Sequence, residues 1–155
     1  MTSRFEGEIS MKKCKEVMTK NLVCCFPNDT VIKAAELMKS ENVGSIPVVE
    51  NDQTQRLVGI VTDRDLALKV LAAGLDSKST KVEAVMTRKV VTCRAGADLQ
   101  KALDVMSKHQ LRRIPVVDSD NKILGIISQA DVAIHYGHPK RTAIMVKEIS
   151  QANGN

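Results

Sequence analysis

The chain has 155 residues, of which 43% are apolar and only 2% aromatic, and its formal net charge is +5. This length fits one domain or two small ones with an aliphatic core, and the scarcity of rings argues against a single-strand nucleic-acid binder that stacks bases. The mild positive charge suits an anionic ligand or a weak nucleic-acid contact and does not decide between them.

The sequence lacks the usual marks of a membrane or secreted protein. It has no run of about 18 apolar residues, and its N-terminal residues show no secretory signal pattern. Its four cysteines show no CxxC pair and no spacing typical of a disulfide framework. We therefore expect a cytoplasmic protein with reduced thiols and no membrane contact, and we leave a redox role open.

The chain contains an internal repeat, which decides its organisation. Residues 17–67 and 85–133 both carry VMT, then IPVV, an acidic turn, a G-I pair and a closing D-x-A. The second repeat is shorter, and the gap falls in the polar turn at residues 51–55.

The first repeat predicts elements in the order β-α-β-β-α. Its first helix is amphipathic, because Val31, Ala34, Ala35 and Met38 recur with helical spacing, and Asp29 or Thr30 is the expected N-cap. The expected elements are a strand at 22–25, this helix, strands at 46–50 and 57–61, and a helix at 63–73.

The second repeat predicts the same order. Leu99, Ala102, Leu103 and Met106 give its first helix an apolar face, and Asp98 is the expected N-cap. The expected elements are a strand at 90–93, this helix, strands at 114–118 and 123–127, and a helix at 129–136.

One such unit would struggle to fold alone, because a small sheet needs its apolar face covered. We therefore expect an α/β (α+β) protein in which two β-α-β-β-α repeats pack around a pseudo-twofold axis. The expected parts are the first repeat at 11–73, a polar linker at 74–81, the second repeat at 82–137 and a partly helical tail at 138–155.

Each repeat places a hydroxyl and a carboxylate three residues apart where its last strand meets its last helix. In the stretch GIVTDRDL these are Thr62 and Asp65, and in GIISQAD they are Ser128 and Asp131. Thr-x-x-Asp is close to a capping box, so helix capping alone would explain the pair. A helix N-terminus also offers free amides to a phosphate, so binding is the competing interpretation.

The repeated order of VMT, I-P-V-V and G-h-h-[S/T]-x-x-D resembles the CBS domain family. The resemblance covers roughly residues 14–136, which look like a tandem CBS pair, or Bateman module. Each mark is weak alone, whereas their order, found twice, is specific. The resemblance implies a regulatory module that binds adenosine-containing ligands in the cleft between the repeats.

The resemblance also implies roles for individual residues. Thr62 and Asp65 would form one half-site, with the hydroxyl on phosphate and the carboxylate on the ribose hydroxyls, and Ser128 and Asp131 would form the other. Adenine would lie against the first strand and the I-P segment of each repeat. The residues concerned are Leu22, Val23, Ile46 and Pro47, and Val90, Val91, Ile114 and Pro115.

Three arginines differ between the repeats and are candidates for phosphate contact. Arg64 follows Asp63 in the first repeat, where the second repeat has Ala130. Arg112 and Arg113 precede I-P in the second repeat, where the first has Gly44 and Ser45. The planar guanidinium pairs phosphate through two hydrogen bonds. The alternative is that these arginines are solvated or pair with nearby aspartates.

The expected ligand is AMP, ADP, ATP or NAD, since the arginines favour a phosphorylated ligand over S-adenosylmethionine. The resemblance implies a homodimer. Ligand binding would change the packing of the repeats or the dimer arrangement, and an unidentified protein partner would respond to that change. The rival interpretation is a non-enzymatic scaffold or nucleic-acid-binding protein that uses its basic surface and binds no nucleotide. A third interpretation is a degenerate pair of CBS repeats that binds no ligand and only dimerises.

Catalysis and metal binding have little support. Thr62 and Ser128 lack an adjacent base that would make them nucleophiles, so we expect neither an enzyme nor a catalytic cofactor. His135 and His138 resemble a metal pair, but no third ligand is evident. We therefore expect no metal site.

Overall fold

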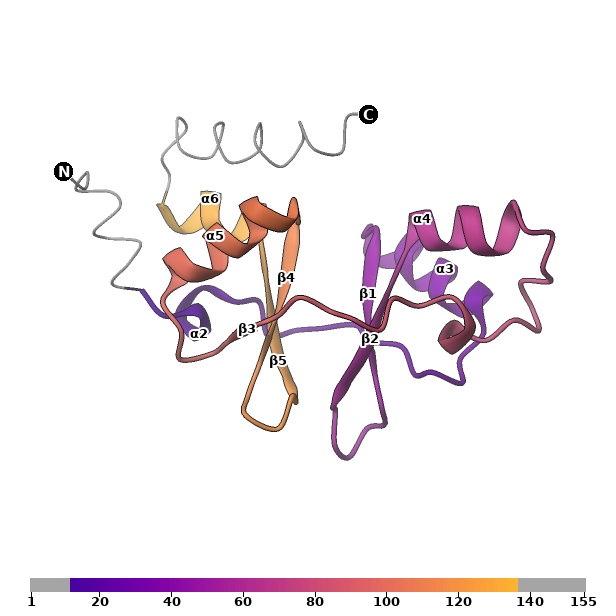
Figure 1. Ribbon diagram of the computed structural model, residues 1–155, viewed down its shortest axis with the longest axis horizontal. Coiled ribbons are helices and arrows are strands. Elements are labelled where there is room, and N and C mark those ends of the chain that lie inside the picture. Colours follow the sequence, from indigo (N-terminus) through magenta and orange to yellow (C-terminus); the bar gives the residue numbers. More distant parts are fainter. Residues whose placement is uncertain (1–11, 137–155) are drawn as a thin grey trace. The chain divides into compact units, whose positions relative to one another are not determined.

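The computed structural model describes the backbone of residues 12–136 and the side chains of residues 12–133 (Figure 1). The expected tail at 138–155 and the histidine pair of the HYGH stretch therefore lie outside the described part. None of the helices described is both long enough and apolar enough to cross a lipid bilayer.

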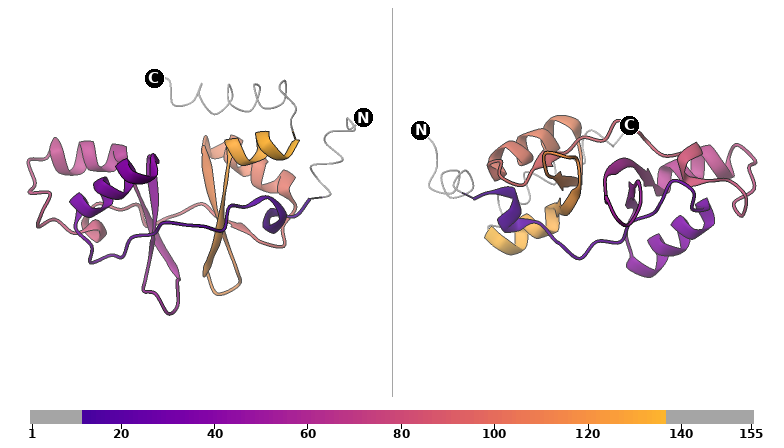
Figure 2. Two further views of the ribbon diagram at one scale, coloured as in Figure 1. Left: turned by 180° about the vertical axis from the view of Figure 1, so that it is seen from behind. Right: turned by 90° about the horizontal axis from the view of Figure 1, so that it is seen from below.

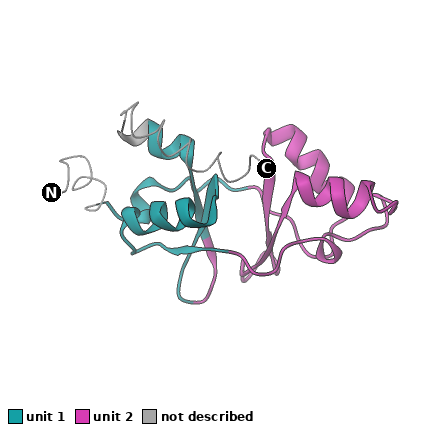
Figure 3. Cartoon of the chain, turned by 45° about the horizontal axis from the view of Figure 1, so that its top comes forward, with its two compact units in different colours: residues 1–22, 91–119, 124–155 teal, residues 23–90, 120–123 magenta. Residues whose placement is uncertain are grey.

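The chain forms two compact units, and each unit combines segments of both repeats (Figure 3). Within the described residues, unit 1 contains the chain up to residue 22, residues 91–119, and the chain from residue 124. Unit 2 contains residues 23–90 and 120–123. Most of the second repeat thus belongs to unit 1, and most of the first repeat belongs to unit 2.

Unit 2 is built on a pair of antiparallel strands. Ser45 lies opposite Thr62, and the register shifts by a bulge between Val48 and Val49. Two helices, α3 and the helix made by α4 and η1, lie on one side of the strand pair (Figures 1 and 2). The elements are α3 (Val31–Glu41), β1 (Ser45–Val49), β2 (Leu57–Thr62), α4 (Asp63–Leu66), the π-helical segment η1 (Ala67–Leu71) and the short 3-10 helix η2 (Val82–Ala84).

Unit 1 repeats this plan with an additional short strand. Its sheet has the order β3-β4-β5, and β3 runs parallel to β4. The elements are α2 (Cys14–Val17), β3 (Cys93–Arg94), α5 (Leu99–His109), β4 (Arg113–Val117), β5 (Ile123–Ser128) and α6 (Gln129–Tyr136). The first residue of β5 is counted with unit 2.

The expected first strands are the poorest match between sequence and structure. The strand expected at 22–25 is wrong, since only Cys25 forms a parallel bridge, with Val48. Pairing stops there because the Phe26 N–H donates to the Asp29 carboxylate at 2.8 Å, which turns the chain away from the sheet. Of the strand expected at 90–93, only the last residue, Cys93, is in a strand, and it begins β3.

The two long helices begin differently. Thr30 caps α3 as predicted, with its hydroxyl 3.4 Å from the Lys33 amide. Asp98 occupies the N-cap position of α5 as predicted, but its side chain makes no capping hydrogen bond. The first amide of α5, on Leu99, donates instead to the Lys12 carbonyl at 2.8 Å, and the Asp98 carboxylate pairs with Lys13 at 2.7 Å.

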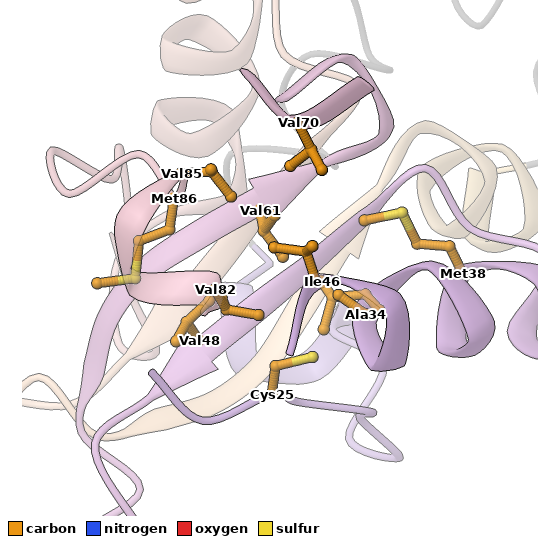
Figure 4. Packing of buried hydrophobic residues seen from close by; sticks show 11 residues of the cluster. Cys25, Ala34, Met38, Ile46, Val48, Val61, Val70, Val82, Val85 and Met86 are labelled. Atoms are coloured by element: carbon orange, nitrogen blue, oxygen red, sulfur yellow. The ribbon is translucent and has the colours of Figure 1, made fainter. Parts of the chain in front are cut away.

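Each unit has its own aliphatic core, formed by its helices and the inner faces of its strands. Figure 4 shows the core of unit 2, where Ala34 of α3 and Ile46 of β1 lie close together near Cys25. The fully buried members of this core include Cys25, Ala34, Val48, Val61 and Val82. Those of unit 1 include Cys14, Leu99, Ala102, Met106, Ile114, Val116 and Ile127.

The segment that leads into each repeat pairs with the last strand of the other repeat. We call residues 12–19 and 80–87 the leading segments. Thr19 exchanges two backbone hydrogen bonds with Ile126, at 2.8 and 3.0 Å, and Thr87 exchanges two with Ile60, at 2.8 and 2.9 Å. This segment exchange, in which each leading segment pairs with the last strand of the other repeat, explains why each compact unit contains parts of both repeats.

The exchange also explains the repeated glycine of the G-I pairs. A Cβ added to Gly125 would lie 2.6 Å from the Met18 sulfur and 2.9 Å from its Cβ. A Cβ added to Gly59 would lie 2.6 Å from the Met86 sulfur. The methionine of each VMT therefore packs directly on a glycine of the strand it joins, where no side chain fits.

We expect Gly125→Ala to destabilise the protein by about 1–3 kcal/mol, because overpacking forces Met18 or the strand to move. Gly96→Ala is the matched control, since a Cβ there meets nothing within 4 Å. It should leave the free energy of unfolding equal or raise it by about 0.4–1 kcal/mol. Urea unfolding measures both. Equal losses in the two variants, or no recovery when Met18→Ala is added to Gly125→Ala, would contradict this packing.

Candidate functional site

The junction between β2 and α4 is closed by two reciprocal hydrogen bonds. The Thr62 hydroxyl accepts from the Asp65 N–H at 3.0 Å, and the Asp65 Oδ2 accepts from the Thr62 N–H at 2.9 Å. The predicted Thr-x-x-Asp capping box is confirmed. Since the Thr62 hydroxyl oxygen accepts this bond, its proton remains available to a further acceptor such as phosphate.

The junction between β5 and α6 has the same geometry. The Ser128 hydroxyl accepts from the Asp131 N–H at 3.1 Å, and the Asp131 Oδ2 accepts from the Ser128 N–H at 2.9 Å. Each aspartate thus satisfies a backbone amide that the helix itself leaves without a partner. Both the capping interpretation and the binding interpretation fit this geometry, because one Asp oxygen remains for another partner.

That remaining oxygen has a different partner in each unit. Asp65 Oδ1 forms an ion pair with Lys69 Nζ at 3.0 Å, and the same ammonium donates to the Val85 carbonyl at 3.0 Å. Asp131 Oδ1 instead accepts from the Thr19 hydroxyl at 3.0 Å. Thr19 belongs to a leading segment, so the exchange described above is what brings it to Asp131.

The residue before each I-P strand is tied to the same junction. The Asp63 N–H donates to the Gly44 carbonyl at 2.9 Å, and the Gln129 N–H donates to the Arg112 carbonyl at 3.2 Å. Unit 1 therefore brings Arg112 and the following Arg113 to the same junction as Asp131.

The predicted phosphate arginines lie in both units. Arg64 is exposed on α4 in unit 2, next to the capping box. Arg112 is exposed and Arg113 half-buried at the start of β4 in unit 1. Each arginine is thus available near the junction of its own unit, and phosphate contact remains a prediction.

The predicted adenine-binding residues are mostly buried. Ile46 and Ile114 are 1% and 0% exposed, and Pro47 and Pro115 beside them are also buried. All four residues, backbone included, have little accessible surface in this structure, so their contact with adenine remains a prediction. The first-strand residues are more open, because Leu22, Val23, Val90 and Val91 are all half-buried.

The four cysteines are free thiols in the structure. Cys25 is a buried core residue, and burial raises the pKa of its thiol to about 11. A hydrogen bond with Cys14 raises the pKa of the Cys93 thiol, and the same bond lowers the pKa of Cys14. Within the described residues, no group of three His, Cys, Asp or Glu side chains could hold a metal ion.

Sequence reasoning missed two residues that contact the aspartates, Thr19 and Lys69. Thr19 was visible only as the last letter of a repeated mark, VMT. Lys69 lies one helical turn after Asp65, a spacing that permits an ion pair, while the sequence has His135 at the same distance from Asp131. This difference between the repeats was the available signal for Lys69.

Comparisons with known proteins agree with this architecture. The family model described as "CBS domain" matches residues 14–72 and 82–137. The chain is 38% identical over 143 residues to the CBS domain-containing protein YhcV of Bacillus subtilis, covering 92% of this chain and 99% of that protein.

Two similar solved structures contain adenosine compounds. The structure of CBSX2 in complex with AMP has a TM-score of 0.69 and 30% identity, covering 83% of this chain and 98% of that one. The CBS domain pair of protein MJ0100, in complex with 5'-methylthioadenosine and S-adenosyl-L-methionine, has a TM-score of 0.68 and 28% identity, covering 81% of this chain and 96% of that one. With its doubled fold, its two matching junctions and these relatives, the chain belongs to the CBS domain family and carries two CBS domains in tandem.

Proposed function

We propose that this protein is a regulatory module that binds an adenosine nucleotide at the Asp65 and Asp131 half-sites. The observation that carries the proposal is the junction found in both units, where a capping Asp keeps one carboxylate oxygen for a further donor. The AMP complex of a structure with 30% identity supports an adenosine ligand.

The ribose and the phosphate of an adenine nucleotide each have a matching group at these junctions. The Asp carboxylate accepts hydrogen bonds from the ribose hydroxyls, as acidic residues do in other nucleotide-binding folds. The hydroxyls of Thr62 and Ser128 donate to phosphate, together with amides at the helix start. Arg64, Arg112 and Arg113 add positive charge, which favours AMP, ADP, ATP or NAD over S-adenosylmethionine.

The proposed mechanism is sensing rather than catalysis. A ligand that binds one arrangement of the module more tightly shifts its population toward that arrangement, and a partner reads the change. Neither Thr62 nor Ser128 has a base as its hydrogen-bond partner here, since both oxygens accept backbone amides. We therefore propose a cytoplasmic, non-enzymatic role with no catalytic cofactor.

The exposed leucines of unit 2 support self-association. Leu68, Leu71 and Leu75 are 52%, 82% and 49% exposed, and they follow one another along η1 and the turn after it. Large apolar side chains grouped on a surface commonly mark an interface. We propose that a second copy of this chain covers them in a homodimer.

Nucleotide binding is best tested by thermal unfolding with AMP, ADP, ATP, NAD and S-adenosylmethionine. A ligand present at 100 times its Kd should add about 2.7 kcal/mol to the free energy of unfolding. We expect a phosphorylated ligand to give the largest shift. Asp131→Asn should reduce it, because the amide oxygen can still accept from the Ser128 N–H while the charge that holds ribose is lost.

The matched control is Asp104→Asn, an exposed Asp on α5 whose carboxylate accepts a hydrogen bond from the Gln100 side chain. It should leave the nucleotide shift unchanged. The rival basic-surface function predicts no shift with any nucleotide and an affinity for DNA or RNA that falls steeply with salt, independent of Asp65 and Asp131. That pattern would reject nucleotide sensing.

Self-association can be checked separately by light scattering after size exclusion. Leu71→Ser removes the most exposed of the three leucines, and we expect it to shift the protein toward monomer with little change in the unfolding of the monomer itself. Ala72→Ser changes the adjacent exposed residue as a control. A native protein that is monomeric at high concentration, or a Leu71→Ser protein that remains dimeric, would contradict this interface.

A further inference from the structure

We infer that the two half-sites are unequal: Asp131 is the tighter ribose site, Thr19 assists it, and Lys69 competes with ligand for Asp65. The inference rests on the proposed function, which it deepens by naming the residues that set the affinity of each site. Its basis is the different partner that each Asp Oδ1 has within its own unit.

In unit 2, each carboxylate oxygen of Asp65 already has one partner. Its Oδ2 accepts from the Thr62 amide, and its Oδ1 pairs with the Lys69 ammonium at 3.0 Å. The Val85 carbonyl holds the same ammonium at 3.0 Å, so the lysine is fixed from two directions. The Asp65 side chain is only 11% exposed, whereas that of Lys69 is 48% exposed. Lys69 therefore lies on the solvent side of the carboxylate.

In unit 1, the corresponding carboxylate is more open. Asp131 is half-buried, and its Oδ1 contacts the hydroxyl of an exposed residue, Thr19. The backbone of Thr19 is fixed by its two hydrogen bonds with Ile126, so the hydroxyl is held at the carboxylate.

Ribose chemistry distinguishes these two environments. The vicinal ribose hydroxyls are donors that seek acceptors. A threonine hydroxyl that donates to Asp131 retains acceptor lone pairs, so Thr19 and Asp131 together present acceptors to both ribose hydroxyls. An ammonium has three donors and no acceptor. Lys69 consequently uses up acceptor capacity of Asp65, and ribose must displace it or share the carboxylate.

Isothermal titration of the full chain with AMP tests this difference. We expect two classes of site whose Kd values differ by about tenfold, which corresponds to about 1.4 kcal/mol. Asp131→Asn should remove the tighter class and Asp65→Asn the weaker one. Lys69→Met should tighten the weaker class by about fivefold, and Thr19→Val should weaken the tighter class by a similar factor.

Two variants serve as matched controls. Lys33→Met breaks another ion pair between Lys and Asp one helical turn apart in unit 2, with Asp29 at 3.1 Å. Thr87→Val changes the threonine of the other leading segment. Both should leave the two Kd values unchanged, and thermal unfolding should show that all six variants are folded.

Equal affinities at the two sites, or weaker AMP binding in Lys69→Met, would overturn the inference while leaving the proposed function standing. The second result would mean that Lys69 contacts the nucleotide itself. Absence of AMP binding to the folded native protein, together with no thermal shift from ADP, ATP or NAD, would overturn the proposed function and this inference with it.

Discussion

Each unit depends on a leading segment that comes from the other repeat. The two backbone hydrogen bonds between Thr19 and Ile126, and the two between Thr87 and Ile60, attach that segment to the last strand of the unit. The methionine before each threonine then packs on a glycine that has no space for a Cβ. Each unit is therefore completed by a segment of the other repeat.

The same attachment produces a difference between the two junctions. The backbone bonds of the two junctions are alike, because capping the last helix requires the same Ser or Thr and Asp in both repeats. The side chains that reach the free carboxylate oxygen differ: Thr19 arrives with a leading segment, whereas Lys69 comes from the following helical turn. A duplicated scaffold thus keeps one fold while the carboxylates of its two junctions have different partners.

The sequence predicted what local patterns determine. The strands β1, β2, β4 and β5, the apolar faces of α3 and α5 and the capping box at Thr62 follow from hydrophobic period and capping chemistry. The structure confirms these four strands within one residue at each end, and it confirms the capping box. The strand expected at 22–25 ends early at a local turn, which the Asp29 carboxylate closes. The Asp98 side chain does not cap α5 because it pairs with Lys13, a residue far away in the sequence. Thr19 was missed for the same reason, since its partner is far away in the sequence.

The most direct measurement is the change in backbone amide NMR shifts when AMP is added to the labelled native protein. If the capped junctions are the binding sites, the largest changes should occur at residues 128–131 and then at 62–65, and Asp131→Asn should abolish the first group. Changes confined to exposed lysines elsewhere, with both junctions silent, would contradict nucleotide binding at these aspartates.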